Sequence, residues 1–222
     1  MSKTGIAHEG YQQGVDQATD YWNRKSSNSS TYGESVEQNT RPQRMRYESF
    51  IIRNELENSS VLDVGCGAGD FLYHLQKRGI QVDYTGTDIS EKMIETCVAR
   101  FPEHRFVHQD ITRTRDSMAY DHVVSFGIHN IRIESGWTVL EECSRRQFDL
   151  CRKSAHISIL TDRYTAFDEH IQSWQAERIL EFALSITPYV SLHHDYLPND
   201  FSVTLHRQPL IDTLDDLLLD YD

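Results

Sequence analysis

From Ser60 onward, short apolar runs alternate with longer stretches in which apolar residues recur every three or four positions. Short runs are typical of buried strands, and the longer spacing is typical of helices that bury one side. Strands are predicted near residues 61–64, 82–87, 105–109, 121–126, 154–160, 188–196 and 201–207. Helices are predicted near residues 69–78, 90–100, 136–151 and 173–186. This alternation predicts a parallel sheet with helices on both faces.

The last two predicted strands are joined only by residues 197–200, Leu-Pro-Asn-Asp. A connection this short cannot cross over between parallel strands, so these two strands must form an antiparallel hairpin. The expected fold class is therefore α/β, with a seven-stranded, mostly parallel sheet, helices on both faces and a C-terminal antiparallel hairpin.

The chain divides into three parts by composition. Residues 1–40 are polar, with one short helix expected around Gln13 to Trp22, but they also carry aromatic residues at positions 11, 21, 22 and 32. We expect this arm to act as a lid over a domain that spans residues 41–208 and begins with a helix from about Pro42 to Leu56. Residues 209–222 form an acidic tail with leucines at helical spacing. A docking helix for a second subunit, giving a homodimer, and a weakly packed tail both fit this spacing, and we favour the tail.

Residues 61–70, Val-Leu-Asp-Val-Gly-Cys-Gly-Ala-Gly-Asp, are typical of a strand that breaks into a tight glycine turn and opens a helix. Such a turn brings the backbone close to a ligand, and the first helical N–H groups point at it. The spacing is G-x-G-x-G after an acid, Asp63, whereas the dinucleotide fingerprint is G-x-G-x-x-G. The motif therefore indicates a nucleoside-type cofactor whose binding needs no phosphate.

Three later segments follow this turn in order, and each brings a polar side chain to the end of a predicted strand. They are residues 84–90 with Asp88, residues 106–111 with Asp110, and residues 120–128 with Ser125. With the glycine turn, this series resembles class I S-adenosylmethionine-dependent methyltransferases. The resemblance implies S-adenosylmethionine as cofactor, S-adenosylhomocysteine as product and no metal. Asp88 would accept hydrogen bonds from both ribose hydroxyls, and Asp110 would meet the adenine amino group.

The cofactor-binding residues implied by this resemblance come from all four segments, from the helix predicted near residues 90–100 and from the helix before the first strand. They are Asp63, Gly65, Cys66, Gly67, Gly69, Asp88, Ile89, Met93, Asp110, Ile111, Ser125 and Arg46. The Arg46 guanidinium is a candidate partner for the methionine carboxylate, and an arginine lying along a helix surface is the equal alternative.

The fourth strand is followed by His129 and Asn130, in the region where acceptor and sulfonium should meet. Both are candidate catalytic residues; the alternative for His129 is a surface-loop histidine. The segment lacks the Asp/Asn-Pro-Pro-Tyr quartet of enzymes that methylate DNA adenine or glutamine amides, so those acceptors are disfavoured.

A closer resemblance, to an uncharacterised bacterial branch of the family, covers most of the chain. It rests on residues 43–47, 186–188, 194–198 and 201–203. In that branch an aromatic residue stands where this chain has His129, and the branch lends no substrate.

Composition and charge limit the classes of partner that the protein is expected to bind. The net charge is −12, which disfavours a nucleic-acid substrate because phosphate backbones need Lys and Arg. No apolar run reaches the ~18 residues of a membrane span, and the four cysteines form no CxxC pair, so a soluble cytoplasmic protein without zinc or disulfide is expected.

The leading interpretation is methyl transfer to O or N of a small molecule. A protein acceptor, or a non-catalytic module that binds S-adenosylmethionine or S-adenosylhomocysteine, are the alternatives.

Overall fold

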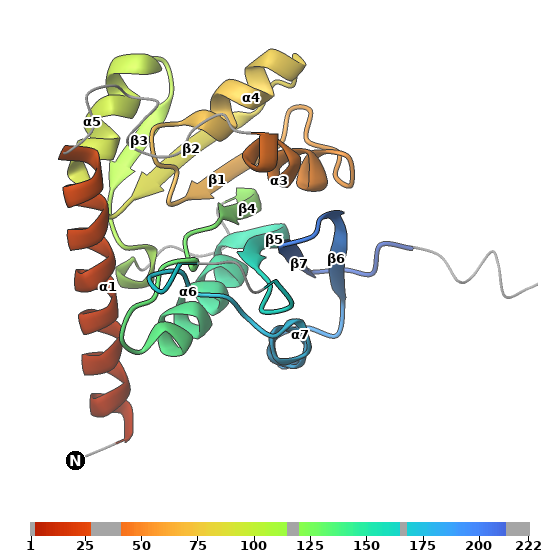
Figure 1. Ribbon diagram of the computed structural model, residues 1–222. Helices are drawn as coiled ribbons and strands as arrows, with labels where there is room; N and C mark the ends of the chain where they lie inside the picture. Colours follow the sequence, from red (N-terminus) through yellow and green to blue (C-terminus); the bar gives the residue numbers. More distant parts are fainter. Residues whose placement is uncertain (1–2, 28–40, 115–119, 165–167, 212–222) are drawn as a thin grey trace, which may run out of the picture.

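The computed structural model describes residues 3–27, 41–114, 120–164 and 168–211. Its strands form one seven-stranded sheet in the order β3-β2-β1-β4-β5-β7-β6, with helices packed around it (Figure 1). The strands are β1 (Ser60–Val64), β2 (Asp83–Asp88), β3 (Arg105–His108), β4 (Tyr120–Phe126), β5 (Cys151–Leu160), β6 (Val190–Leu197) and β7 (Asp200–His206). The helices are α1 (Lys3–Ser27), α3 (Arg41–Ile51), α4 (Asp70–Arg78), α5 (Glu91–Arg100), the 3-10 turn η1 (Ile111–Arg113), α6 (Gly136–Leu150) and α7 (Ala176–Leu184).

Strands β1 to β5 pair in parallel, and β7 lies antiparallel between β5 and β6. The predicted hairpin is confirmed, with Leu197 opposite Asp200 across the turn. Because the parallel strands all end at one edge of the sheet, the segments after β1, β2, β3 and β4 meet there.

Neighbouring residues of the central strands point to opposite faces, as the pleat requires. Val61 of β1 belongs to a buried cluster with α3 and α4, whereas Leu62 belongs to a second cluster with α6 and α7. On β4, Val124 and Val123 divide in the same way. This two-sided burial explains why the strands appear in the sequence as continuous apolar runs rather than as alternating ones.

Two histidines are buried on the face covered by α3. The ring of Phe50 lies 5.8 Å from the ring of His122 on β4 and 4.9 Å from that of His156 on β5. Burial lowers the pKa of His122 to about 4 and that of His156 to about 3. Their Nδ1 atoms pair with the hydroxyls of Ser154 and Thr204, so both rings are uncharged at neutral pH.

The N-terminal arm differs from the prediction of one short helix. Residues 3–27 form the single long helix α1, which packs against α6 and α5. Small residues let the two helices approach: a Cβ at Gly14 would lie 2.7 Å from Cγ2 of Val139, and one at Gly10 would lie 2.9 Å from Oγ of Ser135. Glycine at a four-residue spacing therefore marks the face that α1 turns toward α6.

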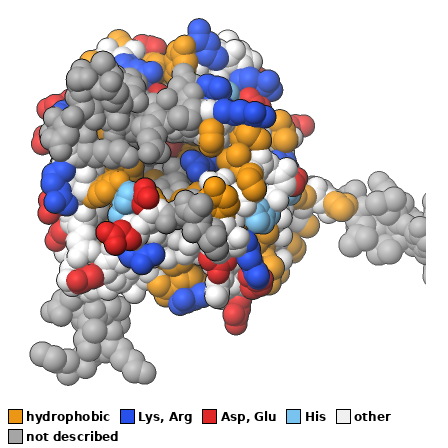
Figure 2. Space-filling view, in the orientation of Figure 1, with side chains coloured by type: hydrophobic (Ala, Val, Ile, Leu, Met, Phe, Trp, Pro, Cys, Tyr) orange, Lys and Arg blue, Asp and Glu red, His pale blue; other side chains and the backbone are white. Residues whose placement is uncertain are grey.

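Two sequence predictions lie outside the described residues: Tyr32 of the arm, and the tail from residue 212 onward. In the part of the chain that the structure describes, no helix combines the length and the apolar character needed to cross a membrane. On the face shown in Figure 2, Lys and Arg side chains are interspersed with Asp and Glu, and hydrophobic side chains gather toward the middle.

Candidate functional site

The glycine turn lies between the end of β1 and the start of α4. Gly65 has a φ of 70°, in the left-handed region that favours glycine. The N–H groups of Gly65 and Cys66 both donate to the carbonyl of Thr87, over 2.7 and 2.9 Å, which ties the turn to β2. A Cβ at Gly65 would overlap Cγ2 of Ile128 in the segment after β4. The turn is therefore held between two neighbouring strand ends.

Asp88, the last residue of β2, holds the other side of this turn. Its Oδ2 accepts the N–H of Gly67 over 2.9 Å, and its Oδ1 accepts the N–H of Ser90 over 2.8 Å. Burial raises the pKa of Asp88 to about 6, and no lysine or arginine is paired with it among the described side chains. The carboxylate keeps lone pairs for further donors at a place poor in water.

Asp63 lies beneath the turn, on β1. Its Oδ2 accepts the hydroxyl of Tyr84 over 2.7 Å, and burial raises its pKa to about 7. Near it, Asp70 opens α4 and forms an ion pair of 3.1 Å with Arg100. The turn is thus underlaid by acidic side chains.

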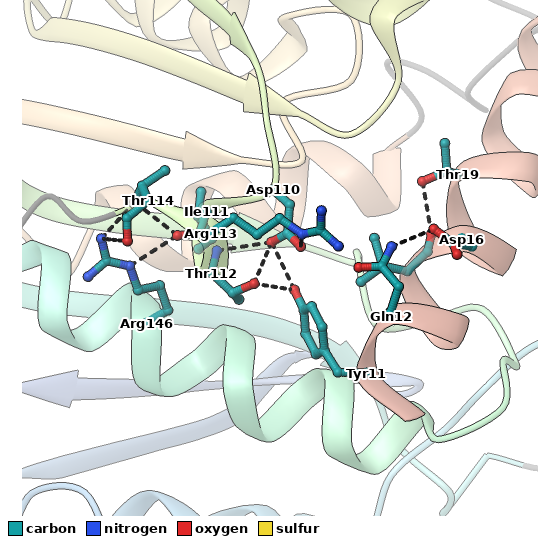
Figure 3. Close-up of polar contacts among 11 residues, drawn as sticks. Tyr11, Gln12, Asp16, Thr19, Asp110, Ile111, Thr112, Arg113, Thr114 and Arg146 are labelled. Atoms are coloured by element: carbon teal, nitrogen blue, oxygen red, sulfur yellow. Dashed lines mark hydrogen bonds and ion pairs between the residues drawn. The ribbon is translucent and has the colours of Figure 1, made fainter. Parts of the chain in front are cut away.

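Asp110 follows β3 and caps the 3-10 turn η1. Its Oδ1 accepts the backbone N–H of Thr112 over 2.9 Å and the hydroxyl of Tyr11 over 2.8 Å, and the Thr112 hydroxyl donates to that of Tyr11 (Figure 3). The Oδ2 atom is buried and receives no hydrogen bond from any described residue, although Nε of Arg113 lies 3.7 Å away. A buried acceptor of this kind fits an N–H donor from a ligand.

These side chains surround a pocket of about 650 Å³, between α1 and the carboxyl edge of the sheet. Its lining comprises Tyr11, Val15, Ala18, Trp22, Val64, Gly65, Thr87, Asp88, Ile89, Gln109, Asp110, Ile111, Ile128, His129, Ile133, Val139 and Cys143. A cavity of about 350 Å³ adjoins it through three shared residues and is lined by Trp22, Gly65, Gly67, Met93, Phe126, Gly127 and Ile128.

Eight of the predicted site residues line one of these two cavities. They are Gly65, Gly67, Asp88, Ile89, Met93, Asp110, Ile111 and His129. Seven of them follow or end β1, β2, β3 and β4, which is the grouping that the order of motifs predicts, and Met93 comes from α5.

His129 is buried, and its Nε2 has no hydrogen-bond partner among the described residues. Its backbone carbonyl accepts the indole N–H of Trp174 over 3.0 Å, which fixes the segment. Burial lowers the pKa of His129 to about 4, so the ring is neutral near pH 7. Of the two interpretations, a surface-loop histidine is wrong, since the ring is only 5% exposed.

Three other predicted residues lie beside the cavities and support them. Oδ1 of Asn130 accepts the N–H of Leu160 over 3.0 Å, which braces the segment after β4 against β5. Oγ of Ser125 accepts the side-chain amide of Gln147 over 3.2 Å. The Cys66 side chain packs in a small cluster with Ile94 and Cys97.

Asp63, described above, Gly69 and Arg46 are the other predicted residues that do not line either cavity. Gly69 precedes α4 in the left-handed conformation. Nε of Arg46 lies 2.6 Å from Oδ2 of the buried Asp200 at the start of β7. The structure therefore gives the Arg46 guanidinium a protein partner, and its contact with a methionine carboxylate stays a prediction.

The sequence did not single out the residues that close the pocket from outside. Val15 and Ala18 of α1, and Val139 and Cys143 of α6, line it as apolar walls. The available signal is the series Gly10, Gly14 and Ala18 in a polar arm, which is typical of a closely packed helix. Burial raises the pKa of Cys143 to about 12, so this thiol stays protonated and unreactive.

The residues present fit S-adenosylmethionine. Asp88 offers a buried carboxylate to hydroxyl donors, and Asp110 leaves one buried oxygen for an amino donor. The described residues contain no cluster of His, Cys, Asp or Glu that could hold a metal ion. When bound, the cofactor would supply an activated methyl group, and the chain would supply its position.

Comparisons with known proteins point the same way. A family model described as a methyltransferase domain matches residues 61–147. A candidate methyltransferase of Mycobacterium tuberculosis, Rv1506c, is 29% identical over 163 residues, which are 70% of this chain and 98% of that protein.

Solved structures share the fold. Magnesium protoporphyrin IX methyltransferase from Synechocystis PCC 6803, with bound S-adenosylmethionine, superposes with a TM-score of 0.59 at 17% identity, over 85% of this chain and 90% of that one. A TehB-like S-adenosylmethionine-dependent methyltransferase from Corynebacterium glutamicum gives 0.55 at 19% identity, over 87% and 97%. Residues 61–147 therefore match a methyltransferase domain, and the strand order and the solved structures show that the chain has the fold of class I S-adenosylmethionine-dependent methyltransferases.

Proposed function

We propose that this methyltransferase acts on an oxygen or nitrogen atom of a small molecule that binds beneath α1. The observation that carries the proposal is His129, whose buried Nε2 has no hydrogen-bond partner among the described residues and whose side chain lines the same pocket as Asp88 and Asp110. Because His129 lines the pocket, a bound acceptor can supply the hydrogen-bond partner that its Nε2 lacks.

The shape of the site favours a small acceptor. Four residues of α1, from Tyr11 to Trp22, line the pocket on the side away from the sheet, and Tyr11 is hydrogen-bonded to Asp110. A protein segment would need α1 to leave, whereas a small molecule can be enclosed by it. Enclosure excludes water and holds acceptor and methyl group in line, which supplies most of the acceleration that methyl transfer needs.

The test is transfer of labelled methyl from S-adenosylmethionine into a metabolite extract and, in parallel, into a protein extract. The proposal predicts label in small molecules, loss of that label in His129→Gln, and unchanged S-adenosylhomocysteine binding by that variant. Label in protein would support the protein-acceptor alternative. Binding of S-adenosylmethionine without any transfer would support a non-catalytic binding module.

A further inference from the structure

We propose that the acceptor is an uncharged, largely apolar molecule that presents one hydroxyl group to Nε2 of His129. This inference rests on the proposed function and names the substrate class of the same site. Its basis is the pocket lining, which includes neither lysine nor arginine among the described residues.

The charges at the pocket disfavour an anionic acceptor. Asp88 and Asp110, which would hold the cofactor, are the acidic side chains that line it, and among the described residues the lining includes no lysine or arginine to pair with a carboxylate or phosphate of the acceptor. An anionic acceptor would therefore be unpaired in a site of low polarity, which is strongly unfavourable. Recognition of an acidic metabolite would therefore need a basic residue that this lining lacks.

The walls of the pocket match apolar surface. Val15, Ala18 and Trp22 of α1 lie on one side, and Ile128, Ile133 and Val139 close the other. Burying apolar area against such walls is favourable in proportion to the area removed from water. The acceptor can therefore gain its affinity from shape and apolar contact.

Charge balance during transfer also favours a neutral hydroxyl compound. As the acceptor oxygen bonds to the methyl carbon, its proton passes to Nε2 of His129, the C–S bond breaks, and its electron pair stays on sulfur. The positive charge of the sulfonium is thereby replaced by that of the imidazolium, in a pocket that already holds Asp88 and Asp110. A hydroxyl needs such a proton acceptor, whereas an uncharged amine does not.

The experiment compares two fluorescent probes that differ by one charge, 2-naphthol and 6-hydroxynaphthalene-2-sulfonate. Each is titrated into the full-length chain saturated with S-adenosylhomocysteine, whose own binding is measured by thermal shift on the same sample. We expect 2-naphthol to bind at least about tenfold more tightly than the sulfonate, a difference of about 1.4 kcal/mol.

A charge added to the wall provides the matched variant. Ala18→Lys places an ammonium at the pocket and should reduce the preference for 2-naphthol by about tenfold. Thr19→Lys adds the same charge to the same helix, at a residue that does not line the pocket, and should leave the preference unchanged.

Absence of S-adenosylhomocysteine binding would overturn the proposed function, and this inference with it. Normal S-adenosylhomocysteine binding with no binding of 2-naphthol, or with equal or tighter binding of the sulfonate, would overturn the inference alone.

Discussion

The hydroxyl of Tyr11 donates a hydrogen bond of 2.8 Å to Oδ1 of Asp110, across 99 residues of sequence. The same carboxylate caps the 3-10 turn after β3 and leaves its other oxygen buried without a hydrogen bond from the described residues (Figure 3). Docking of α1 and the proposed binding of the adenine amino group therefore depend on one side chain. We infer that each favours the other, because both hold Asp110 in the same position.

Tyr11→Phe tests this coupling. The variant keeps the buried ring and loses only the hydroxyl. Because the hydrogen bond to Asp110 is lost, we expect the free energy of S-adenosylhomocysteine binding to weaken by about 1 kcal/mol. Calorimetric titration should show a roughly fivefold weaker affinity for S-adenosylhomocysteine. Tyr189→Phe, at a half-exposed position before β6, is the matched hydroxyl deletion and should bind normally. Identical affinities for the two variants would separate α1 from the cofactor site.

Removal of residues 1–33 tests the lid proposal. The sheet and its two clusters of buried residues do not need α1, so we expect the shortened chain to fold but to lose methyl transfer and part of its stabilisation by S-adenosylhomocysteine. Thermal melting with and without S-adenosylhomocysteine, followed by turnover once an acceptor is known, gives both results. Unchanged stabilisation and unchanged turnover would show that α1 is only an extension.

Gly65→Ala tests whether the glycine turn between β1 and α4, which we call the cofactor cradle, binds the cofactor. The added methyl group would overlap Cγ2 of Ile128, and alanine at a φ of 70° costs about 1–2 kcal/mol. We expect a folded protein with at least tenfold weaker binding of S-adenosylhomocysteine. The double variant with Ile128→Ala removes the overlap but keeps the backbone strain, so it should recover part of the affinity. If Gly65→Ala binds as tightly as the unmodified chain, the turn does not form the cofactor cradle.

The sheet could be predicted from the sequence for two reasons. The apolar runs are short and continuous, as in strands buried on both faces, and the stretches between them carry apolar residues every three or four positions, as in helices. The sequence also grouped Gly65, Asp88 and Asp110, since parallel strands end at one edge and each residue follows a strand. Both features depend on local sequence or on the order of strands, so they can be recognised without a structure.

The partners of side chains far apart in sequence could not be predicted in this way. Arg46 meets Asp200 over 154 residues, and α1 closes the pocket through contacts that depend on the packed positions of α5 and α6. The extent of α1 was missed for a similar reason, because polar sequence with interspersed glycine has weak helix propensity and gains its helix from packing.

Acid stability provides a test of the buried histidines. The pKa of His156 is about 3 in the folded chain, below its ordinary value of 6.5, so the unfolded chain binds more protons between these values. The stability it contributes is present above pH 6.5 and is lost as the pH falls toward 3. Asp63 and Asp88, whose pKa values burial raises to about 7 and 6, act in the opposite direction.

The His156→Gln variant shows how much of the pH dependence of the unfolding free energy comes from His156. Its unfolding free energy, measured by urea denaturation, should fall less steeply than that of the unmodified chain between pH 6 and 4. The difference should approach 1.4 kcal/mol per pH unit, the value for one proton. Equal slopes for the two proteins would mean that His156 is not held neutral by burial.

The central claim is that the cradle between β1 and β2 binds S-adenosylmethionine through Asp88. Isothermal titration of S-adenosylmethionine into the unmodified chain, Asp88→Ala and Asp83→Ala tests it most directly, since Asp83 is the exposed acid at the other end of the same strand. We expect Asp83→Ala to bind normally and Asp88→Ala, still folded by circular dichroism, to lose about 1.5–3 kcal/mol, because charge-assisted hydrogen bonds to the ribose disappear. Equal affinity of all three proteins would contradict the account.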